Sequence, residues 1–239
     1  MGVEVTKDDL NSKANWDDRF SHNGRWEKNN GRSQTRIFAE GFNRVINMPF
    51  DHFSLLDVGC ALGDAIPVFK NKYPHAILSG CDFSATGIER CVKDYGGIAS
   101  FFASSIENIN GKWDAIYCSN VLEHFHNPVQ LAQQLLGNCR ILYLMLPYKE
   151  LENRQPLTSA SNNQNGHIYS FFMSSFNTLL ENGPASAINT TILGCPGAWG
   201  WTFQRKVLHV ISAIRHWHRF DEIFIYRKQI IFEIHGKNS

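Results

Sequence analysis

Apolar and polar positions alternate in blocks along most of the chain, and each block has the length of one strand or one helix. Short apolar runs typical of buried strands are followed by segments with apolar residues at helical spacing. The runs that predict strands are FSLLDVG, AILSGCDFS, ASFFASSI, the start of WDAIYCSNVLEHF, and RILYLMLP. Strands interleaved with helices predict an α/β fold with a parallel sheet covered on both faces.

The two ends of the chain carry a weaker pattern. Residues 34–48 show helical spacing, while the polar stretch before them, NWDDRFSHNGRWEKNNGRSQTR, is expected to be regular only in part. Toward the C-terminus, SFFMSSFNTLLENG predicts a helix, ASAINTTILG and KQIIFEIHG predict strands, and WTFQRKVLHVISAIRHWHRF predicts a long amphipathic helix. We therefore predict one doubly wound domain over residues 51–239, with an N-terminal cap over 1–50 and a helical insertion at about 195–226.

Composition narrows the class of protein. The 239 residues are 43% hydrophobic and carry a formal charge of +1, so no global field favours nucleic acid or an anionic membrane. Six scattered cysteines argue for a reducing compartment and against a disulfide framework or a zinc site. No apolar run approaches the ~18–20 residues of a membrane helix, and the polar N-terminus lacks a signal-peptide core. We expect a soluble, cytoplasmic protein, and leave its oligomeric state open.

The segment LLDVGCALGDA, residues 55–65, is the first candidate for chemistry. Gly59 and Gly63 allow a tight turn after the first strand and close approach of a ligand to the backbone. Asp82 ends the second strand about 25 residues after Asp57, where nucleotide-binding units carry a ribose-binding carboxylate. The pattern predicts a site for an adenosine-containing cofactor.

The acids at the ends of the turn, Asp57 and Asp64, favour one cofactor over another. Carboxylates oppose a pyrophosphate, and Ala61 replaces the middle glycine of a dinucleotide motif. S-adenosylmethionine carries an ammonium and a sulfonium and has no phosphate, so it suits this turn. The interpretation is S-adenosylmethionine rather than NAD.

Several segments together resemble one enzyme family. LLDVGCALGDA resembles the first motif of class I methyltransferases, and LSGCDFS is similar to the acidic end of their second strand. WDAIYCSNVLEHFHNP and ILYLMLPY resemble the fourth and fifth strands of the type 11/23-like branch. The resemblance spans roughly residues 53–150 and implies a Rossmann-like, mostly parallel seven-stranded sheet whose last strand is antiparallel.

The resemblance also implies cofactor contacts in the first half of the domain. Asp57, Gly59 and Gly63 would shape the methionine pocket, and Cys60 lies in the same turn. Asp82 would accept hydrogen bonds from both ribose hydroxyls, beside Phe83 at the adenine. The remaining implied contacts are Ser104, Ser105 and Ile106 at the adenine amino group, and Ser119 and Asn120 under the methionyl part. Family members often carry Asp where this chain has Ser105.

Two histidines are the candidates for acceptor chemistry. His124 is expected at the mouth of the fourth strand, where a neutral imidazole suits removal of a hydroxyl proton. The alternative is that Glu123 and His124 only brace the loop. His167, with Tyr169, follows the fifth strand, where family members gather acceptor-binding residues. The alternative is that His167 only stands at the entry of the next helix. His126 is expected to be solvated.

The cap and the long helix add further candidates. Arg32 or Arg36 would pair with the methionine carboxylate, while Trp16 and Trp26 would stack on a sugar or planar acceptor or only anchor a loop. The helix 201–220 carries an apolar stripe and basic residues, and it fits core packing, an acceptor wall, or a partner or membrane surface. Its neighbouring histidines, His216 and His218, lack other ligands, so no metal is expected.

The leading hypothesis is therefore a small-molecule methyltransferase. The style of VLEHFHNP, LMLPYKE and GHIYSF resembles methyltransferases of surface polysaccharide pathways, which implies O-methylation of a sugar or glycan-linked intermediate. Natural-product and quinone-like acceptors are the alternatives. A non-catalytic scaffold is disfavoured because the glycine turn and its acids are intact. An NAD-dependent oxidoreductase is disfavoured by the acids of the turn, and a nucleic-acid methyltransferase by the missing N/D-P-P-Y/F motif.

Overall fold

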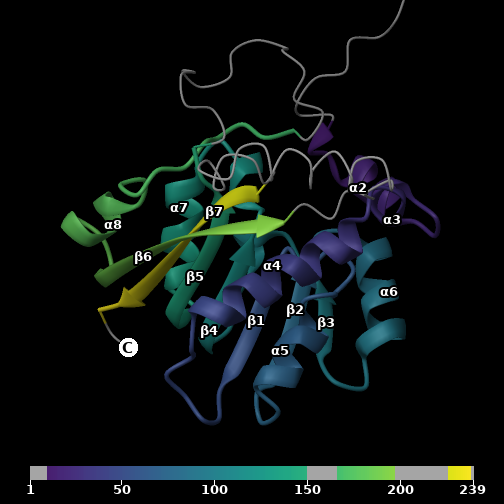
Figure 1. Ribbon diagram of the computed structural model, residues 1–239, viewed down its shortest axis with the longest axis horizontal. Helices are drawn as coiled ribbons and strands as arrows, with labels where there is room; N and C mark the ends of the chain where they lie inside the picture. Colours follow the sequence, from purple (N-terminus) through teal and green to yellow (C-terminus); the bar gives the residue numbers. More distant parts are fainter. Residues whose placement is uncertain (1–9, 150–165, 197–225, 238–239) are drawn as a thin grey trace, which may run out of the picture.

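The computed structural model of the chain describes residues 10–149, 166–196 and 226–237, and these ranges form one central sheet (Figure 1). Seven strands lie in the order β3-β2-β1-β4-β5-β7-β6. The strands are β1 Ser54–Val58, β2 Ile77–Asp82, β3 Ser100–Ala103, β4 Trp113–Ser119, β5 Cys139–Pro147, β6 Ala185–Pro196 and β7 Tyr226–Gly236. Strands β1 to β5 are parallel, and β7 is antiparallel to both of its neighbours. The predicted doubly wound α/β sheet with an antiparallel last strand is confirmed.

Helices cover both faces of this sheet. The main ones are α4 Gly31–Val45, α5 Ile66–Lys72, α6 Ala85–Tyr95 and α7 Pro128–Leu136. On one face, α4 and α5 lie across the strands (Figure 1), and Phe42 of α4 packs edge-on against Tyr117 and Tyr143. On the other face, α7 buries Leu131 and Leu135. A sheet buried on both faces explains why its strands read as continuous apolar runs rather than as alternating ones.

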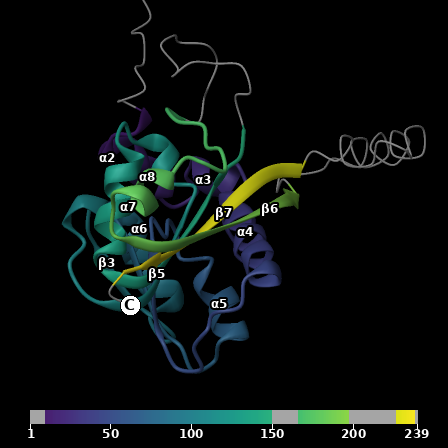
Figure 2. The same cartoon turned by 90° about the vertical axis from the view of Figure 1, so that its left-hand side faces the viewer.

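Two long strands, β7 and β6, form one edge of the sheet. Strands β6 and β7 pair in register from Ala187–His235 to Pro196–Tyr226, and Figure 2 shows them extending side by side next to α4. The close approach of α4 to β6 depends on a glycine, because a Cβ on Gly41 would lie 2.9 Å from the sulfur of Cys195. The helix that leads into the first strand therefore also supports the last pair of strands.

The N-terminal region is more helical than its polar sequence predicted. Helices α2 (Lys13–Phe20) and α3 (Arg25–Lys28) precede α4. From here on, the N-terminal cap means these two helices, which form one part of the cap predicted over residues 1–50. Arg90 of α6 holds the cap, because its guanidinium donates to the backbone oxygens of Phe20 and Ser21 and pairs with Glu27 at 2.7 Å. Tertiary pairing of this kind lets a segment with weak helical periodicity fold as helix.

The C-terminal half departs from prediction in one place. The helix expected over residues 170–183 is limited to α8, Asn177–Glu181, because Phe171 forms a bridge with Tyr148 of the chain beyond β5. Phe171 also stacks on Phe176 with ring centroids 5.8 Å apart, so both rings point into the core. The predicted insertion at 195–226, with the helix 201–220, His216 and His218, falls almost wholly outside the described residues. Within the described ranges, no helix is long and apolar enough to cross a membrane.

Candidate functional site

A cavity of about 330 Å³ opens at the carboxyl ends of the parallel strands. The ends of β1, β2 and β4 and the residues after β3 line it, and the cap and α4 contribute the facing wall. Strand β1 lies between β2 and β4, so the chain crosses to opposite sides of the sheet at this position. Ligands of doubly wound sheets bind outside the carboxyl ends of the strands at such a switch point.

Most of the cofactor residues predicted from the sequence line this cavity. They are Asp57, Gly59, Cys60, Asp82, Phe83, Ser104, Ser105, Ile106, Ser119 and Asn120. The structure does not place Gly63 or Arg36 on the cavity. The sequence thus predicted the residues at the strand ends of the cavity. Arg36, which the sequence paired with the methionine carboxylate, has other contacts in the structure.

The turn after β1 is built from residues with positive φ. Gly59, Ala61 and Gly63 have φ of 72°, 53° and 75°. A Cβ on Gly59 would lie 2.3 Å from a methyl carbon of Val121, so only glycine fits beside the cavity. Gly63 faces the side chains of Tyr95 and Cys91 instead, which gives it a structural role in the turn.

Two buried carboxylates, Asp57 and Asp82, face the cavity at the ends of β1 and β2. Oδ2 of Asp82 accepts from the amide of Ala61 at 3.0 Å, and Oδ1 accepts from that of Ser84 at 2.9 Å. Oδ2 of Asp57 has no hydrogen-bond partner among the described residues. Burial, with the charge of Asp82, raises the pKa of Asp57 to about 8, whereas burial raises the pKa of Asp82 to about 6. Asp57 therefore lacks a cationic partner within the described chain.

Asp64, at the other end of the turn, is fully engaged elsewhere. Its carboxylate accepts from Nε of Arg32 at 2.9 Å, from Nη2 of Arg36 at 2.9 Å and from the hydroxyl of Tyr95 at 2.9 Å. Arg32 also pairs with Asp94 at 2.7 Å. The charge of Asp64, which the sequence suggested would favour one cofactor over another, is therefore compensated by the two arginines of α4. The same contacts explain why Arg32 and Arg36 turn away from the cavity.

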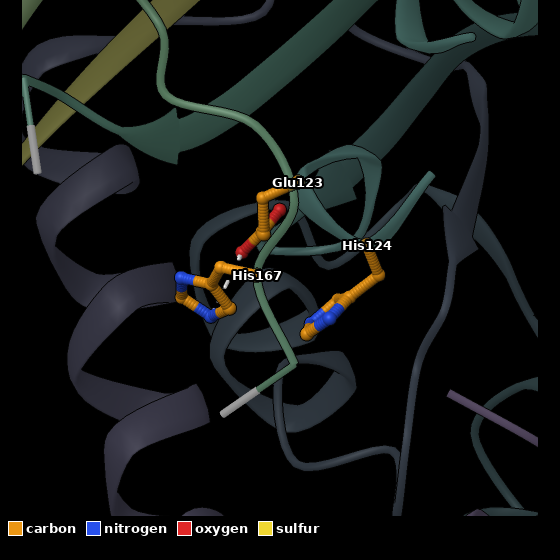
Figure 3. A group of neighbouring side chains, drawn as sticks. All are labelled: Glu123, His124 and His167. Atoms are coloured by element: carbon orange, nitrogen blue, oxygen red, sulfur yellow. Dashed lines mark ion pairs between the residues drawn. The ribbon is translucent and has the colours of Figure 1, made fainter. Parts of the chain in front are cut away.

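The acceptor candidates gather at one end of the cavity, where the 3-10 helix η2, Leu122–His124, follows β4. The backbone oxygen of Glu123 accepts from the amides of Ile168 and Tyr169, which joins the segment after residue 166 to η2. Figure 3 shows Glu123, His124 and His167 pointing toward one another from these two segments. Nε2 of His167 lies 3.9 Å from Oε1 of Glu123, and the two imidazole centroids are 4.9 Å apart.

His124 lines the cavity, whereas His167 lies behind it and does not. Nδ1 of His124 is 3.3 Å from the backbone oxygen of Gly166. A carbonyl only accepts, so this bond requires the proton on Nδ1 and leaves Nε2 of a neutral imidazole as an acceptor. Burial, followed by the charges of His167 and Arg19, lowers the pKa of His124 to about 3. His124 is therefore neutral at physiological pH. His126, in the same loop, is exposed as expected.

Among the described residues, Glu123, His124 and His167 form the group of side chains that could hold a metal ion. Their potential ligand atoms all lie within 4.8 Å of one another. Ligands bound at about 2.1 Å to one ion lie at most about 4.2 Å apart, so coordination requires a contracted arrangement. The set differs from His216 and His218, the histidines weighed as ligands from the sequence.

Sequence reasoning missed several lining residues, part of them because the N-terminal region and α4 fold over the cavity. From that region they are Asn11, Phe20, Gln34, Thr35 and Phe38, and from the segments after β3 and β4 they are Glu107, Val121 and Phe125. The spacing of Gln34, Thr35 and Phe38 places them on one face of α4, and that helical face was the available signal. The helix was predicted, but its periodicity did not reveal that this face meets a ligand cavity.

Trp16 and Trp26 of the cap both line the cavity, as part of an aromatic group with Phe20. Trp16 meets the ring of His124 edge-on at a centroid distance of 5.7 Å. One side of Trp16 is covered by Arg19, whose guanidinium carbon lies 4.0 Å from the ring centroid. The tryptophans are thus packed parts of the wall rather than anchors of a solvated loop.

Comparisons with known proteins identify the family. A family model for a methyltransferase domain matches residues 16–182, so the chain belongs to this methyltransferase family. The family predicted from the sequence is thereby confirmed, and the chain is an enzyme domain of the methyltransferase class. No curated protein matches the chain.

Solved structures share the fold at low identity. The plantazolicin methyltransferase BpumL in complex with SAH is 21% identical, with coverage of 96% of this chain and 91% of that one, at a TM-score of 0.52. Magnesium protoporphyrin IX methyltransferase from Synechocystis PCC 6803 with bound SAH is 18% identical, with coverage of 96% and 98%, at a TM-score of 0.56. A Haloferax volcanii methyltransferase bound to its Trm112 activator is 10% identical, with coverage of 99% of each chain, at a TM-score of 0.61.

Proposed function

We propose that this methyltransferase uses S-adenosylmethionine to methylate a hydroxyl of a small-molecule acceptor, and that the acceptor is a sugar or a glycan-linked intermediate. The observation that carries the donor assignment is Asp57, a buried carboxylate on the cavity wall whose Oδ2 finds no hydrogen-bond partner in the described part of the chain. The ammonium of the cofactor would supply the missing partner. The SAH and SAM bound to the structural neighbours agree with this donor.

The residues around Asp57 fit the rest of the cofactor. A Cβ on Gly59 would clash with Val121, so the turn beside the cavity requires glycine, and Asp82 presents to the cavity a carboxylate that also accepts from backbone amides of the turn and of the chain after β2. Phe83 and Ile106 offer apolar surface for a base. S-adenosylmethionine supplies an electrophilic methyl group on sulfur, and the chain holds and orients it.

His124 is the proposed proton acceptor for the acceptor hydroxyl. It stands on the cavity wall, and its Nε2 carries a lone pair because Nδ1 donates to Gly166. A positioned base contributes about 10²–10⁴-fold to such a transfer when its pKa lies near the working pH, and the pKa of His124 in the ligand-free protein, about 3, is well below that range. Ligand binding must therefore raise the basicity of His124 for it to take the proton. His167, which lies against Glu123 behind His124, is the proposed positioning residue rather than an acceptor contact.

The sugar assignment rests on the resemblance of the loop motifs and on aromatic surface from Trp16 and Trp26 in the wall. Aromatic rings of this kind accept the apolar face of a ring-shaped ligand. The same aromatic wall also supports a second candidate, a planar natural-product acceptor, because relatives in fold include enzymes named for plantazolicin and magnesium protoporphyrin IX.

The test is methyl-labelled S-adenosylmethionine incubated with the protein and with two acceptor panels, nucleotide sugars and methyl glycosides in one, azole-containing peptides and tetrapyrroles in the other. Label in the sugar panel is expected. Label only in the planar panel would contradict the sugar assignment. SAH binding without label transfer to either panel or to host extracts would contradict the catalytic role.

The role of His124 is tested with the acceptor so identified. His124→Gln is expected to lower kcat by about 10²-fold or more while leaving SAH affinity unchanged. His126→Gln, in the same loop but exposed, is the matched control and should keep wild-type turnover. Treatment with EDTA should also leave turnover unchanged, because the imidazoles act directly rather than through a metal. An EDTA-sensitive enzyme would contradict this assignment.

A further inference from the structure

The N-terminal cap carries one arginine, Arg19, that no acid of the described chain pairs with. Every acid of the cap has another basic partner: Asp17 with Lys13 at 2.6 Å, Asp18 with Arg25 at 3.5 Å, and Glu27 with Arg90 at 2.7 Å and Arg32 at 3.6 Å. Arg19 forms no hydrogen bond or ion pair with the described residues. A half-buried cation without an anion is costly unless a ligand completes it.

Arg19 is held by two aromatic rings of the cavity wall, and it does not itself line the cavity. Its guanidinium carbon lies 4.0 Å from the ring centroid of Trp16 and 5.7 Å from that of Trp26, and both rings line the cavity. Stacking leaves the N–H donors of a guanidinium free in its plane, where a carboxylate binds with two parallel hydrogen bonds. Burial and the charge of Arg25 lower the pKa of Arg19 to about 10, so the side chain is charged at neutral pH.

The other arginines near the cavity are already committed. Arg32 and Arg36 pair with Asp64, and Arg90 pairs with Glu27 and with backbone oxygens of the cap. Arg19 is therefore the cation that the described residues leave available at this wall. Trp16, one of the two rings that hold Arg19, also contacts the ring of His124, the proposed proton acceptor.

We propose that Arg19, clamped by Trp16 and Trp26, binds the carboxylate of a ligand that extends from the cavity past these two rings. The proposal rests on the proposed function, because the carboxylate belongs to a small molecule bound in the methyltransferase site. Two sources share this chemistry: the methionine carboxylate of the cofactor, for which the sequence suggested Arg32 or Arg36, and a carboxylate on the acceptor, such as that of a uronic acid.

Binding of an anion at Arg19 also has a consequence for His124. The positive charge of Arg19 is one of the influences that lower the pKa of His124. A carboxylate on Arg19 compensates that charge, so His124 becomes a stronger base when the anion is in place. The site would then couple occupancy of the cavity to proton removal.

The first arm of the test compares two ligands by calorimetry, SAH and 5′-methylthioadenosine, which shares the nucleoside and thioether but lacks the amino-acid carboxylate. If the cofactor is the source, Arg19→Gln lowers SAH affinity at least tenfold and leaves 5′-methylthioadenosine affinity unchanged. Arg19→Lys should recover part of the loss. Arg25→Gln, an exposed arginine of the same cap, is the matched control and should bind SAH as the wild type does.

The second arm reads Arg19 directly by NMR in the SAH-saturated protein, through its side-chain Nε–H resonance, assigned by its loss in Arg19→Lys. If the acceptor is the source, SAH affinity is unchanged in Arg19→Gln, but D-glucuronate shifts this resonance saturably and D-glucose does not. Melting curves of each variant establish that it is folded.

The proposal is overturned if Arg19→Gln binds SAH with wild-type affinity and neither D-glucuronate nor acetate shifts the Arg19 resonance more than that of Arg25. Failure of wild-type protein to bind SAH contradicts the proposed function instead. In that case the carboxylate titrations, run on the ligand-free protein, still decide whether Arg19 binds anions.

Discussion

The two acids that bound the glycine turn lie seven positions apart in sequence and have opposite environments. Asp64 meets two guanidiniums and a tyrosine hydroxyl, so its negative charge is compensated inside the protein. Asp57 is equally buried but has no cation beside it among the described residues, and burial with the charge of Asp82 raises its pKa to about 8. A carboxylate that the fold compensates serves structure, whereas one that it leaves uncompensated on a cavity wall is poised for a ligand.

The same contrast separates the arginines of the N-terminal region. Arg32 and Arg36 carry out the compensation of Asp64, while Arg19 lies against tryptophans with no acid of the described residues beside it. The two uncompensated charges, Asp57 on the cavity wall and Arg19 against the tryptophans of that wall, match a ligand that carries both an ammonium and a carboxylate.

Asp64→Asn should destabilise the protein strongly while sparing ligand binding. The substitution leaves Arg32 and Arg36 without their shared anion, and breaking a buried pair costs about 3–5 kcal/mol, less here because both guanidiniums reach solvent. We expect a loss of about 2–3 kcal/mol in urea unfolding. Asp94→Asn, which removes only the outer partner of Arg32, is the control and should lose much less. Equal losses would show that Asp64 has no special structural role.

Asp57→Asn should do the reverse, by weakening binding and stabilising the ligand-free fold. Loss of a charged hydrogen-bond partner should lower SAH affinity by about 10- to 100-fold, measured by calorimetry. A carboxyl whose pKa is raised by folding binds its proton more tightly in the folded state, so stability falls as pH rises between about 4 and 8. The asparagine variant does not titrate, and should melt at a higher temperature than the wild type at pH 8. A lower melting temperature would contradict the proposed environment of Asp57.

The pH dependence of SAH affinity follows from the same carboxyl. With a pKa of about 8, Asp57 is about half ionised at pH 8 and about one-tenth ionised at pH 7 in the free protein. Because the ammonium needs the ionised form, affinity should fall on the order of fivefold between these pH values. Asp57→Asn should remove this dependence, and a wild-type affinity that is flat from pH 8 to pH 7 would exclude it.

Arg36→Gln should have the smallest effect. Its side chain is 51% exposed, and Asp64 keeps Arg32 and Tyr95 as partners, so the expected loss of stability is about 0.5–1 kcal/mol. SAH affinity should change less than twofold by calorimetry. Arg19→Gln should lower SAH affinity more, if the cofactor supplies the carboxylate that Arg19 binds. A large loss of SAH affinity in Arg36→Gln would restore the role that the sequence first suggested for it.

Local features of the sequence were enough to predict the sheet and the part of the cavity wall at the strand ends. The strands of a buried parallel sheet are continuous apolar runs, and the residues that end or follow them, such as Gly59, Asp82 and Ser119, necessarily collect at one edge. These positions can be read from the chain because each depends on one strand and the turn after it. Their roles toward a ligand remain proposals.

Contacts between distant segments could not be predicted in the same way. Asp64 and Arg36 are 28 positions apart, and only the packing of α4 against the turn brings them together. The same is true of Glu123 and His167, whose meeting depends on the backbone bonds between η2 and the segment after residue 166. The predicted helix over 170–183 was shortened by a bridge from Phe171 to Tyr148, for which helical periodicity gives no signal.

A crystal structure of the protein with SAH would locate both charged groups of the ligand at once and so show which charges of the protein bind it. We expect the SAH ammonium at Asp57 and the ribose hydroxyls at Asp82. If the cofactor is the source of the carboxylate, that group lies on Arg19. In every case Asp64 stays bound to Arg32 and Arg36. An SAH carboxylate held by Arg36, with Asp64 released toward the ligand, would contradict the division between compensated and uncompensated charges.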